Sequence, residues 1–303
     1  MKKTIPIFKD GDRVAFLGDS LTSCGRWIVN IFETYLSLFP DREVRMYNLG
    51  VGGGTCEFAS HYIGADLYTY DPTHVFIMFG ANDMLHYEGR PVDRIHPFLF
   101  DLRRVTDRVI GNGASVSFGI EPKTKSQDQS TVTLRDAAAI AVRTAADDYG
   151  APYLDLYGLM SPFIFSRDDL IGDDLVHFTP LGESVVAKLF LDAQGIDGFS
   201  PDRDDFFDPI PISPRGSELL EVTDKLRRIW MAEANILLAV PGATEDTKMN
   251  RIKGRIPTRA DGAWDDFCYG RALDYVELRP RMNELRARQE ELTERMIRER
   301  VGK

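Results

Sequence analysis

Five short apolar runs, separated by longer stretches in which apolar residues recur at helical spacing, place the strongest constraint on how this chain can fold. The runs are continuous rather than alternating, which is typical of parallel strands that are buried on both faces. They cover residues 14–17, 44–47, 75–79, 114–120 and 152–156. The sequence therefore predicts a central parallel sheet of about five strands.

The stretches between and after these runs carry a helical signal. Strands that alternate with helices along a chain form a sheet that is covered by helices on both faces. We therefore predict an α/β protein with three layers. The expected helices are residues 27–39, 57–70, 94–110, 134–149 and 180–191, the last of which begins with a proline, as first helical turns often do.

The end of the first predicted strand carries a candidate nucleophile. Residues 16–22 read FLGDSLT, which puts Ser20 at the carboxyl tip of that strand. Ligands bind at this edge of an open α/β sheet. A serine is not reactive by itself and commonly caps a helix. Its assignment therefore depends on what later segments supply.

Three later segments supply the other groups that a serine hydrolase needs. A serine nucleophile requires a base, a group that orients the base, and donors for the developing oxyanion. His177 and Asp174 can meet the first two needs. The backbone amides of Ser20 and Gly53 and the side-chain amide of Asn82 can meet the third, although an asparagine there also suits a turn. The segments are NLGVGG at 48–53, GAND at 80–83 and DLVH at 174–177.

In this order, the four segments resemble the four sequence blocks of the SGNH hydrolases, the GDSL esterase and lipase family. The resemblance covers roughly residues 12–195. It implies a flavodoxin-like strand order, a catalytic triad of Ser20, Asp174 and His177, and an oxyanion hole of Ser20, Gly53 and Asn82. It also implies that the chemistry needs neither a metal nor an organic cofactor.

Two other interpretations of the same residues stay open. An acyltransferase would use the same Ser-His-Asp site but would pass the acyl group to an alcohol instead of water. A flavodoxin-like protein would hold a phosphate or nucleotide at a helix N-terminus through Ser20, Thr22 and Ser23. The glycine-rich run at 50–55 does not match the dinucleotide fingerprint, because Thr55 replaces its last glycine.

Composition narrows the partners and the compartment. The chain has 303 residues and a net charge of −10, which argues against a general nucleic-acid binder and against docking on anionic membranes. No apolar segment is as long as a membrane span, and no signal-like run follows the N-terminal lysines. Cys24, Cys56 and Cys268 lack the spacing of a disulfide framework or a zinc site. We predict a cytoplasmic enzyme.

The composition changes near residue 198. We predict a catalytic domain at 1–198, followed by a linker and a mostly helical extension at 199–303. Within the extension, residues 200–214 have no periodicity and are expected to form a linker or a wrapping segment. Residues 219–240 predict a helix, and residues 243–270 are expected to be irregular.

The end of the chain carries a stripe of apolar residues at alternating steps of three and four, as in a heptad repeat. The pattern favours a helix that packs on residues 219–240. A homodimer contact through the C-terminal helices is the second interpretation. The stripe consists of Leu278, Met282, Leu285, Leu292 and Met296, with Gln289 at the one missing position.

The function that these residues predict is a serine-dependent carboxylic ester hydrolase that works through an acyl-enzyme. We expect a small-molecule ester of a short acyl or acetyl group, with esters of carbohydrates as one option, because no long apolar lid suits a lipid. Groups in the C-terminal extension and near the Asn82 segment are candidates to hold a polyol. The candidates near the Asn82 segment are Met84, His86, Tyr87, Arg90 and His96.

Overall fold

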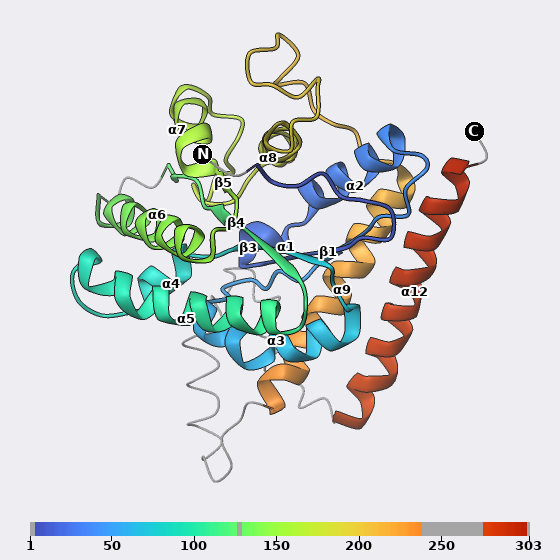
Figure 1. Cartoon of the computed structure of the whole chain (residues 1–303), viewed down its shortest axis with the longest axis horizontal. Helices are drawn as coiled ribbons and strands as arrows, with labels where there is room; N and C mark the ends of the chain where they lie inside the picture. The colour runs from blue at the N-terminus through green and yellow to red at the C-terminus, as the bar shows by residue number, and fades with distance from the viewer. Residues whose placement is uncertain (1–3, 126–128, 238–274, 302–303) are drawn as a thin grey trace.

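The structure, a computed structural model, describes residues 4–125, 129–237 and 275–301 (Figure 1). Its centre is a parallel sheet of five strands in the order β2-β1-β3-β4-β5, which is the flavodoxin-like order. The predicted sheet is confirmed, with strand ends that differ by at most one residue. The strands are β1 Arg13–Gly18, β2 Arg45–Asn48, β3 His74–Met78, β4 Ser115–Ile120 and β5 Tyr153–Asp155.

Helices cover both faces of this sheet (Figure 1). Successive strand residues point to opposite faces, so β1 sends Val14 and Phe16 into one apolar layer and Ala15 and Leu17 into the other. The layer of Val14 contains α2 Arg26–Leu38, α7 Leu156–Ser166 and α8 Pro180–Ala193; that of Ala15 contains α3 Cys56–Tyr70, α5 Pro91–Gly111 and α6 Gln129–Tyr149. The predicted three-layer α/β fold is confirmed.

Besides the four-residue helix at Ser20–Ser23, two short helices were not expected from the sequence. One is α4 Ala81–His86, which follows β3 directly. The other is α7, which begins at Leu156, a residue that the sequence assigns to the last strand. The strand ends earlier because the Asp155 carboxylate accepts the backbone N–H of Gly158 at 2.9 Å and so caps the new helix.

The C-terminal helices lie along the β2 edge of the sheet. They are α9 Pro214–Leu237 and α12 Tyr275–Val301, which run side by side (Figure 1, orange and red). Arg45 on the edge strand forms ion pairs with Glu290, at 3.1 Å, and with Glu294. An edge strand exposes unpaired backbone groups, and this helix pair covers that side of the sheet.

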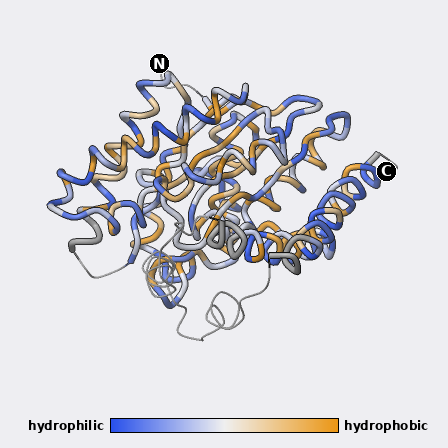
Figure 2. The backbone as a smooth tube through the Cα atoms, turned by 90° about the horizontal axis from the view of Figure 1, so that it is seen from below, coloured by the Kyte–Doolittle hydropathy of each residue, from blue (hydrophilic) through white to orange (hydrophobic). Residues whose placement is uncertain are grey.

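The stripe on α12 faces inward. Met282, Leu292 and Met296 are buried in the apolar layers, and Gln289 donates to Thr223 of α9 at 2.9 Å. Hydrophobic residues recur at intervals among hydrophilic ones along this helix (Figure 2). Apolar residues at steps of three and four form one face of an amphipathic helix. The structure therefore has α12 packing on α9. A homodimer through these helices would use their outer faces; it stays a prediction, which sedimentation would test.

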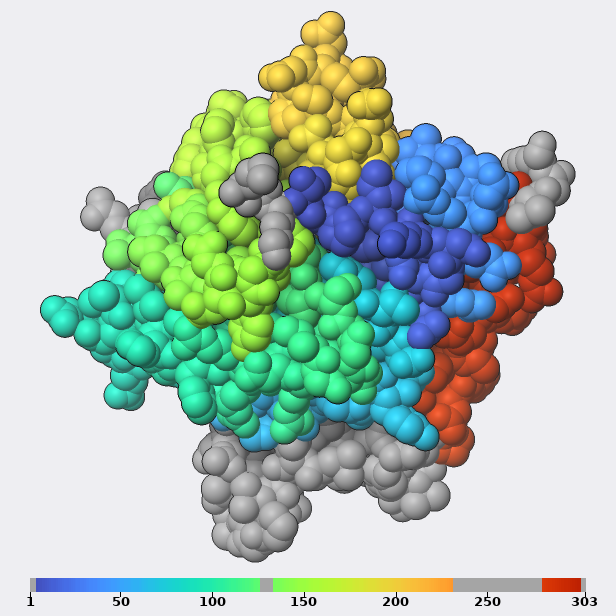
Figure 3. Space-filling model, viewed as in Figure 1, coloured from blue at the N-terminus to red at the C-terminus, as the bar shows by residue number. Residues whose placement is uncertain are grey.

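The predicted wrapping segment lies against α8 and projects at one end of the molecule (Figure 3, yellow). Phe206 is buried and stacks with Phe163 and Phe207. The Lys188 ammonium donates to backbone carbonyls of this segment at 2.7–2.8 Å, so the segment is tied down without regular structure.

Some of the predictions concern residues that the structure does not describe. The end of the helix predicted at 219–240, the irregular region at 243–270, Cys268 and the Leu278 side chain lie outside the described residues. The domain division at residue 198 stays a prediction. Within the described ranges, no helix is both long and apolar enough to cross a membrane.

Candidate active site

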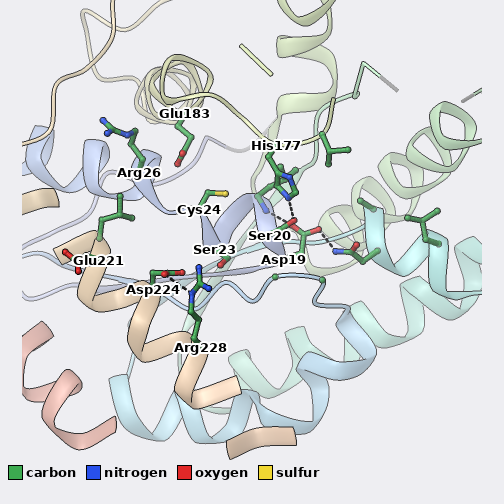
Figure 4. A pocket seen from close by; sticks show the side chains of 18 of the residues that line it. Asp19, Ser20, Ser23, Cys24, Arg26, His177, Glu183, Glu221, Asp224 and Arg228 are labelled. Carbon is green, nitrogen blue, oxygen red and sulfur yellow. Dashed lines mark hydrogen bonds and ion pairs between the residues drawn. The ribbon is translucent and has the colours of Figure 1, made fainter. Parts of the chain in front are cut away.

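Ser20 stands where β1 turns into the short helix α1 Ser20–Ser23 (Figure 4). The Asp19 carboxylate caps this helix by accepting the backbone N–H of Leu21 at 2.9 Å. Gly18 before it has no room for a side chain, because a Cβ would lie 2.4 Å from the Met78 carbonyl oxygen. The strand therefore ends in a tight turn that leaves the Ser20 hydroxyl facing a cavity.

His177 connects Ser20 to Asp174. Its Nε2 lies 2.8 Å from Ser20 Oγ, and its Nδ1 lies 2.7 Å from Asp174 Oδ2. The loop is held by its own backbone, because Asp174 Oδ1 accepts the N–H groups of Val176 and His177, both at 2.9 Å. The structure thus brings the three predicted triad residues together in one hydrogen-bonded chain.

The electrostatics of Asp174 favour its ionised form. Partial burial acts to raise the pKa of this carboxyl, but the backbone N–H groups of His177 and Val176 and the His177 ring outweigh it. The net effect holds the pKa of Asp174 below its usual value. An ionised carboxylate at Nδ1 keeps the proton on that nitrogen and leaves Nε2 to accept one from Ser20.

The predicted oxyanion donors lie on the same cavity. Gly53 has a φ of +70°, a left-handed conformation that favours glycine, and it lines the cavity together with Asn82. In the structure the Asn82 amide donates to Asp19 Oδ2 at 2.9 Å and to the Gly54 carbonyl at 3.2 Å. A bound oxyanion would compete with the longer of these two bonds.

A buried acid below the site was missed from the sequence. Glu121, directly after β4, accepts the backbone N–H of Ala81 at 2.6 Å and pairs with buried Arg135 at 3.3 Å. Burial raises the pKa of Asp19 well above its ordinary value, and the charge of Glu121 and a hydrogen bond with it raise it further. Glu121 thus supports both Asp19 and the turn that carries Asn82. An acid at the carboxyl end of a predicted strand was its only sequence signal.

A model of the GDSL-like Lipase/Acylhydrolase family matches residues 16–185, more than half of the chain. The chain belongs to this family. The predicted membership is confirmed, and the chain is an ester hydrolase of the GDSL type. A flavodoxin-like binding protein is not favoured.

Other known proteins resemble this GDSL hydrolase. An acetylxylan esterase from Geobacillus stearothermophilus is 21% identical over 204 residues, which are 60% of this chain and 93% of the relative. Its crystal structure has a TM-score of 0.55 at 19% identity and covers 64% of this chain and 99% of its own. The structure of a gut microbial diltiazem-metabolizing enzyme has a TM-score of 0.65 at 15% identity. It covers 99% of this chain and 96% of its own, so the shared fold includes the C-terminal helices.

The hydrolase has a cavity of about 710 Å³ around Ser20 and His177. It is lined by loops and helices that follow the strands and, on one side, by α9, so the C-terminal extension forms part of the site. Burial raises the pKa of the Cys56 thiol well above its ordinary value, and the thiol belongs to the core. Among the described residues, no cluster of His, Cys, Asp and Glu side chains is arranged to hold a metal ion.

The expected polyol-holding groups after Asn82 do not line this cavity. Tyr87 hydrogen-bonds Asp101 at 2.5 Å, Met84 is buried in the core, and His86 lies 3.4 Å from Glu57. Arg90 pairs with Asp93 at the start of α5, and His96 lies farther along that helix. The prediction for this region is wrong, because the predicted groups lie on or after α4 without lining the cavity. The one residue that α4 contributes beyond Asn82 and Ala81 is apolar Leu85.

Proposed function

We propose that this GDSL hydrolase cleaves short-acyl esters, acetyl esters first, through an acyl-enzyme on Ser20. The observation that carries the proposal is the continuous Asp174–His177–Ser20 chain, with bonds of 2.7 and 2.8 Å, at the floor of a cavity. A nucleophile in contact with a base, and a base in contact with an orienting acid, is the arrangement that nucleophilic catalysis requires.

In the first half-reaction, His177 Nε2 takes the proton of Ser20 as Oγ attacks the ester carbonyl carbon. Asp174 stabilises the imidazolium that forms. The N–H groups of Ser20 and Gly53 and the amide of Asn82 then receive the oxyanion. As the tetrahedral intermediate collapses, His177 gives its proton to the leaving alcohol. In the second half-reaction His177 takes a proton from water as the water oxygen attacks the acyl carbon. The bond between that carbon and Ser20 Oγ then breaks, the acid leaves, and His177 returns its proton to Ser20.

The acyl preference has separate support. The acetylxylan esterase of similar sequence acts, as its name says, on an acetylated carbohydrate. The cavity volume of about 710 Å³ is within the range of small-molecule sites.

Transfer of the acyl group to an alcohol is the rival outcome of the second step. Mass spectrometry of products formed with an added sugar or glycerol would distinguish transfer from hydrolysis.

The test compares wild type and Ser20→Ala on p-nitrophenyl acetate, butyrate and octanoate. We expect turnover to fall from acetate to octanoate and to be lost in Ser20→Ala, whose circular dichroism and melting temperature stay those of wild type. Rapid quenching should also leave one acetyl group on the wild-type peptide that contains Ser20. A folded, fully active Ser20→Ala protein would refute the proposal.

We also propose a cytoplasmic location. The cysteines support it, because their number and spacing do not suit a disulfide framework. Fractionation of the source cells, with detection of the intact protein, tests it; recovery in the culture medium or periplasm would overturn it.

A further inference from the structure

The cavity at Ser20 continues along α9, which lies beyond the segment that matches the family model. The residues that α9 presents to it recur at steps of three and four, so they form one face of the helix. Figure 4 shows the charged members of this face on one side of Ser20 and His177. The α9 face consists of Ser217, Leu220, Glu221, Asp224 and Arg228.

Charges on this side of the cavity balance each other. Asp224 accepts a hydrogen bond from Arg228 Nε at 2.8 Å, and Glu221 forms an ion pair with Lys225. Arg26 of α2 and Glu183 of α8, a base and an acid, line the same part of the cavity (Figure 4). A site with paired charges of both signs offers many donors and acceptors without a net field. It therefore suits a neutral ligand that is rich in hydroxyl groups.

The other side of the cavity differs in character. Leu85 of α4, Leu134 of α6 and Val176 line it, and the charge of the neighbouring Arg135 is paired with Glu121 at 3.3 Å. Because α4 and α6 follow β3 and β4, whereas α9 lies at the β2 edge, the apolar and charged sides are separated by the end of β1. An ester at Ser20 has two halves. The acyl half can lie against leucine and valine, but on the charged side it would desolvate carboxylates without replacing their hydrogen bonds.

The position of the α9 face is set by a buried contact. Arg227, next to Arg228, binds Asp66 of α3 at 2.9 Å and donates to the Leu49 carbonyl at 2.9 Å. Leu49 begins the loop that carries Gly53, so the α9 face has a defined place relative to the oxyanion donors. Among the described residues that line the cavity there is no Phe, Tyr or Trp side chain. Recognition on this side therefore depends on hydrogen bonds rather than on ring stacking.

We propose that the α9 face, through Asp224 and Arg228, binds the alcohol half of the substrate, and that this alcohol is neutral and polyhydroxylated, as a sugar is. The carboxylate would accept from sugar hydroxyls and the guanidinium would donate to them. This inference rests on the proposed function, in which Ser20 attacks the ester.

The test compares two acetyl esters that differ in their alcohol, an acetylated xylooligosaccharide and p-nitrophenyl acetate. Hydrogen bonds to charged groups contribute enough to binding that losing one lowers kcat/KM about tenfold or more. We expect Asp224→Ala and Arg228→Ala to lower the ratio of kcat/KM for the sugar ester over p-nitrophenyl acetate by at least about tenfold, mainly through KM. Asp224→Asn keeps the shape of the helix face and should show the same direction.

The matched control is Arg295→Ala, which removes an exposed ion pair of the same i,i+4 type on α12, outside the cavity. It should leave the ratio unchanged. An unchanged ratio in folded α9 variants would overturn the inference. A change in the variants' preference between p-nitrophenyl acetate and butyrate would also overturn it, because it would assign the α9 face to the acyl half. Faster wild-type hydrolysis of acetylcholine than of the sugar ester would overturn the inference that the alcohol is neutral. Absence of any Ser20-dependent turnover would instead refute the proposed function.

Discussion

At the scale of single residues, Asp174 is the most exposed member of the proposed triad, with 54% of its side chain accessible. Asp174→Asn keeps the oxygen that accepts backbone N–H groups but puts an amide N–H against His177 Nδ1. The imidazole then favours the wrong tautomer, and we expect kcat on p-nitrophenyl acetate to fall by about 10²–10³-fold, less than the loss for a buried triad acid because water can partly substitute.

The control for this prediction is Asp173→Asn. Asp173 is the exposed neighbouring acid in the same loop, and its replacement should keep kcat within about twofold of wild type. An Asp174→Asn enzyme with half of the wild-type kcat would show that another group orients His177.

The sequence could predict residues whose roles are tied to local motifs. Ser20 and Asn82 stand directly after strands, and Asp174 and His177 share one loop between α7 and α8. The structure brings Ser20, Asn82 and His177 to one cavity, with Asp174 bound to the far side of the His177 ring. Glu121 could not be predicted in the same way. Its contacts with Ala81 and Arg135 arise only when β3, β4 and α6 pack, and an acid after a strand otherwise resembles any loop acid.

At the scale of elements, α2 begins without a cap of its own. Its N-cap residue is Gly25, and the Glu183 carboxylate of α8 accepts the Trp27 N–H at 3.0 Å instead. Burial raises the pKa of Glu183 to about 7, against the lowering effect of the backbone N–H groups of Trp27 and Arg26. In the folded protein the neutral carboxyl is therefore the favoured form up to about pH 7.

This raised pKa predicts how stability depends on pH. Between the ordinary value of 4.5 and about 7, the folded state holds the Glu183 proton more tightly than the unfolded state does. Its contribution to stability is therefore complete below about 4.5 and is lost as the pH rises through 7. Glu183→Gln should remove this loss, which is at most about 3 kcal/mol. Urea unfolding of both proteins at pH 5 and pH 8 measures the free energy of unfolding. If that free energy changed equally between the two pH values in wild type and Glu183→Gln, the prediction would be contradicted.

The elements that the sequence missed have a common physical reason. The helix α4 has six residues, and α7 contains Pro162, so neither offers a clear periodic pattern. The long helices α2, α5 and α8 did show one, and the structure has them within three residues of the expected ends. The apolar stripe near the end of the chain lies within α12, for which the sequence indicated a helix without defined ends. What periodicity could not indicate was that α9 would line the cavity, because that depends on a contact between residues 161 positions apart.

At the scale of the whole molecule, that contact joins the extension to the catalytic part. Arg227 and Asp66 are both almost fully buried, with exposed side-chain fractions of 6% and 1%. Removing one partner leaves a buried charge unpaired, so Arg227→Met should lower the free energy of unfolding by about 3–5 kcal/mol. Replacing both residues, by Arg227→Met with Asp66→Leu, should recover most of that loss, because the pair as a whole adds little over apolar packing.

Urea unfolding followed by circular dichroism measures the free energy of unfolding of both variants. The control is Arg203→Met, which breaks an exposed ion pair with Asp205. Its expected cost is at most about 1 kcal/mol. Because α9 contributes to both apolar layers of the sheet, we expect one transition for the whole chain, with esterase activity lost in step. If Arg227→Met instead melted in two steps, with Ser20-dependent activity surviving the first, the helices would be a separable domain and the division near residue 198 would be a true folding boundary.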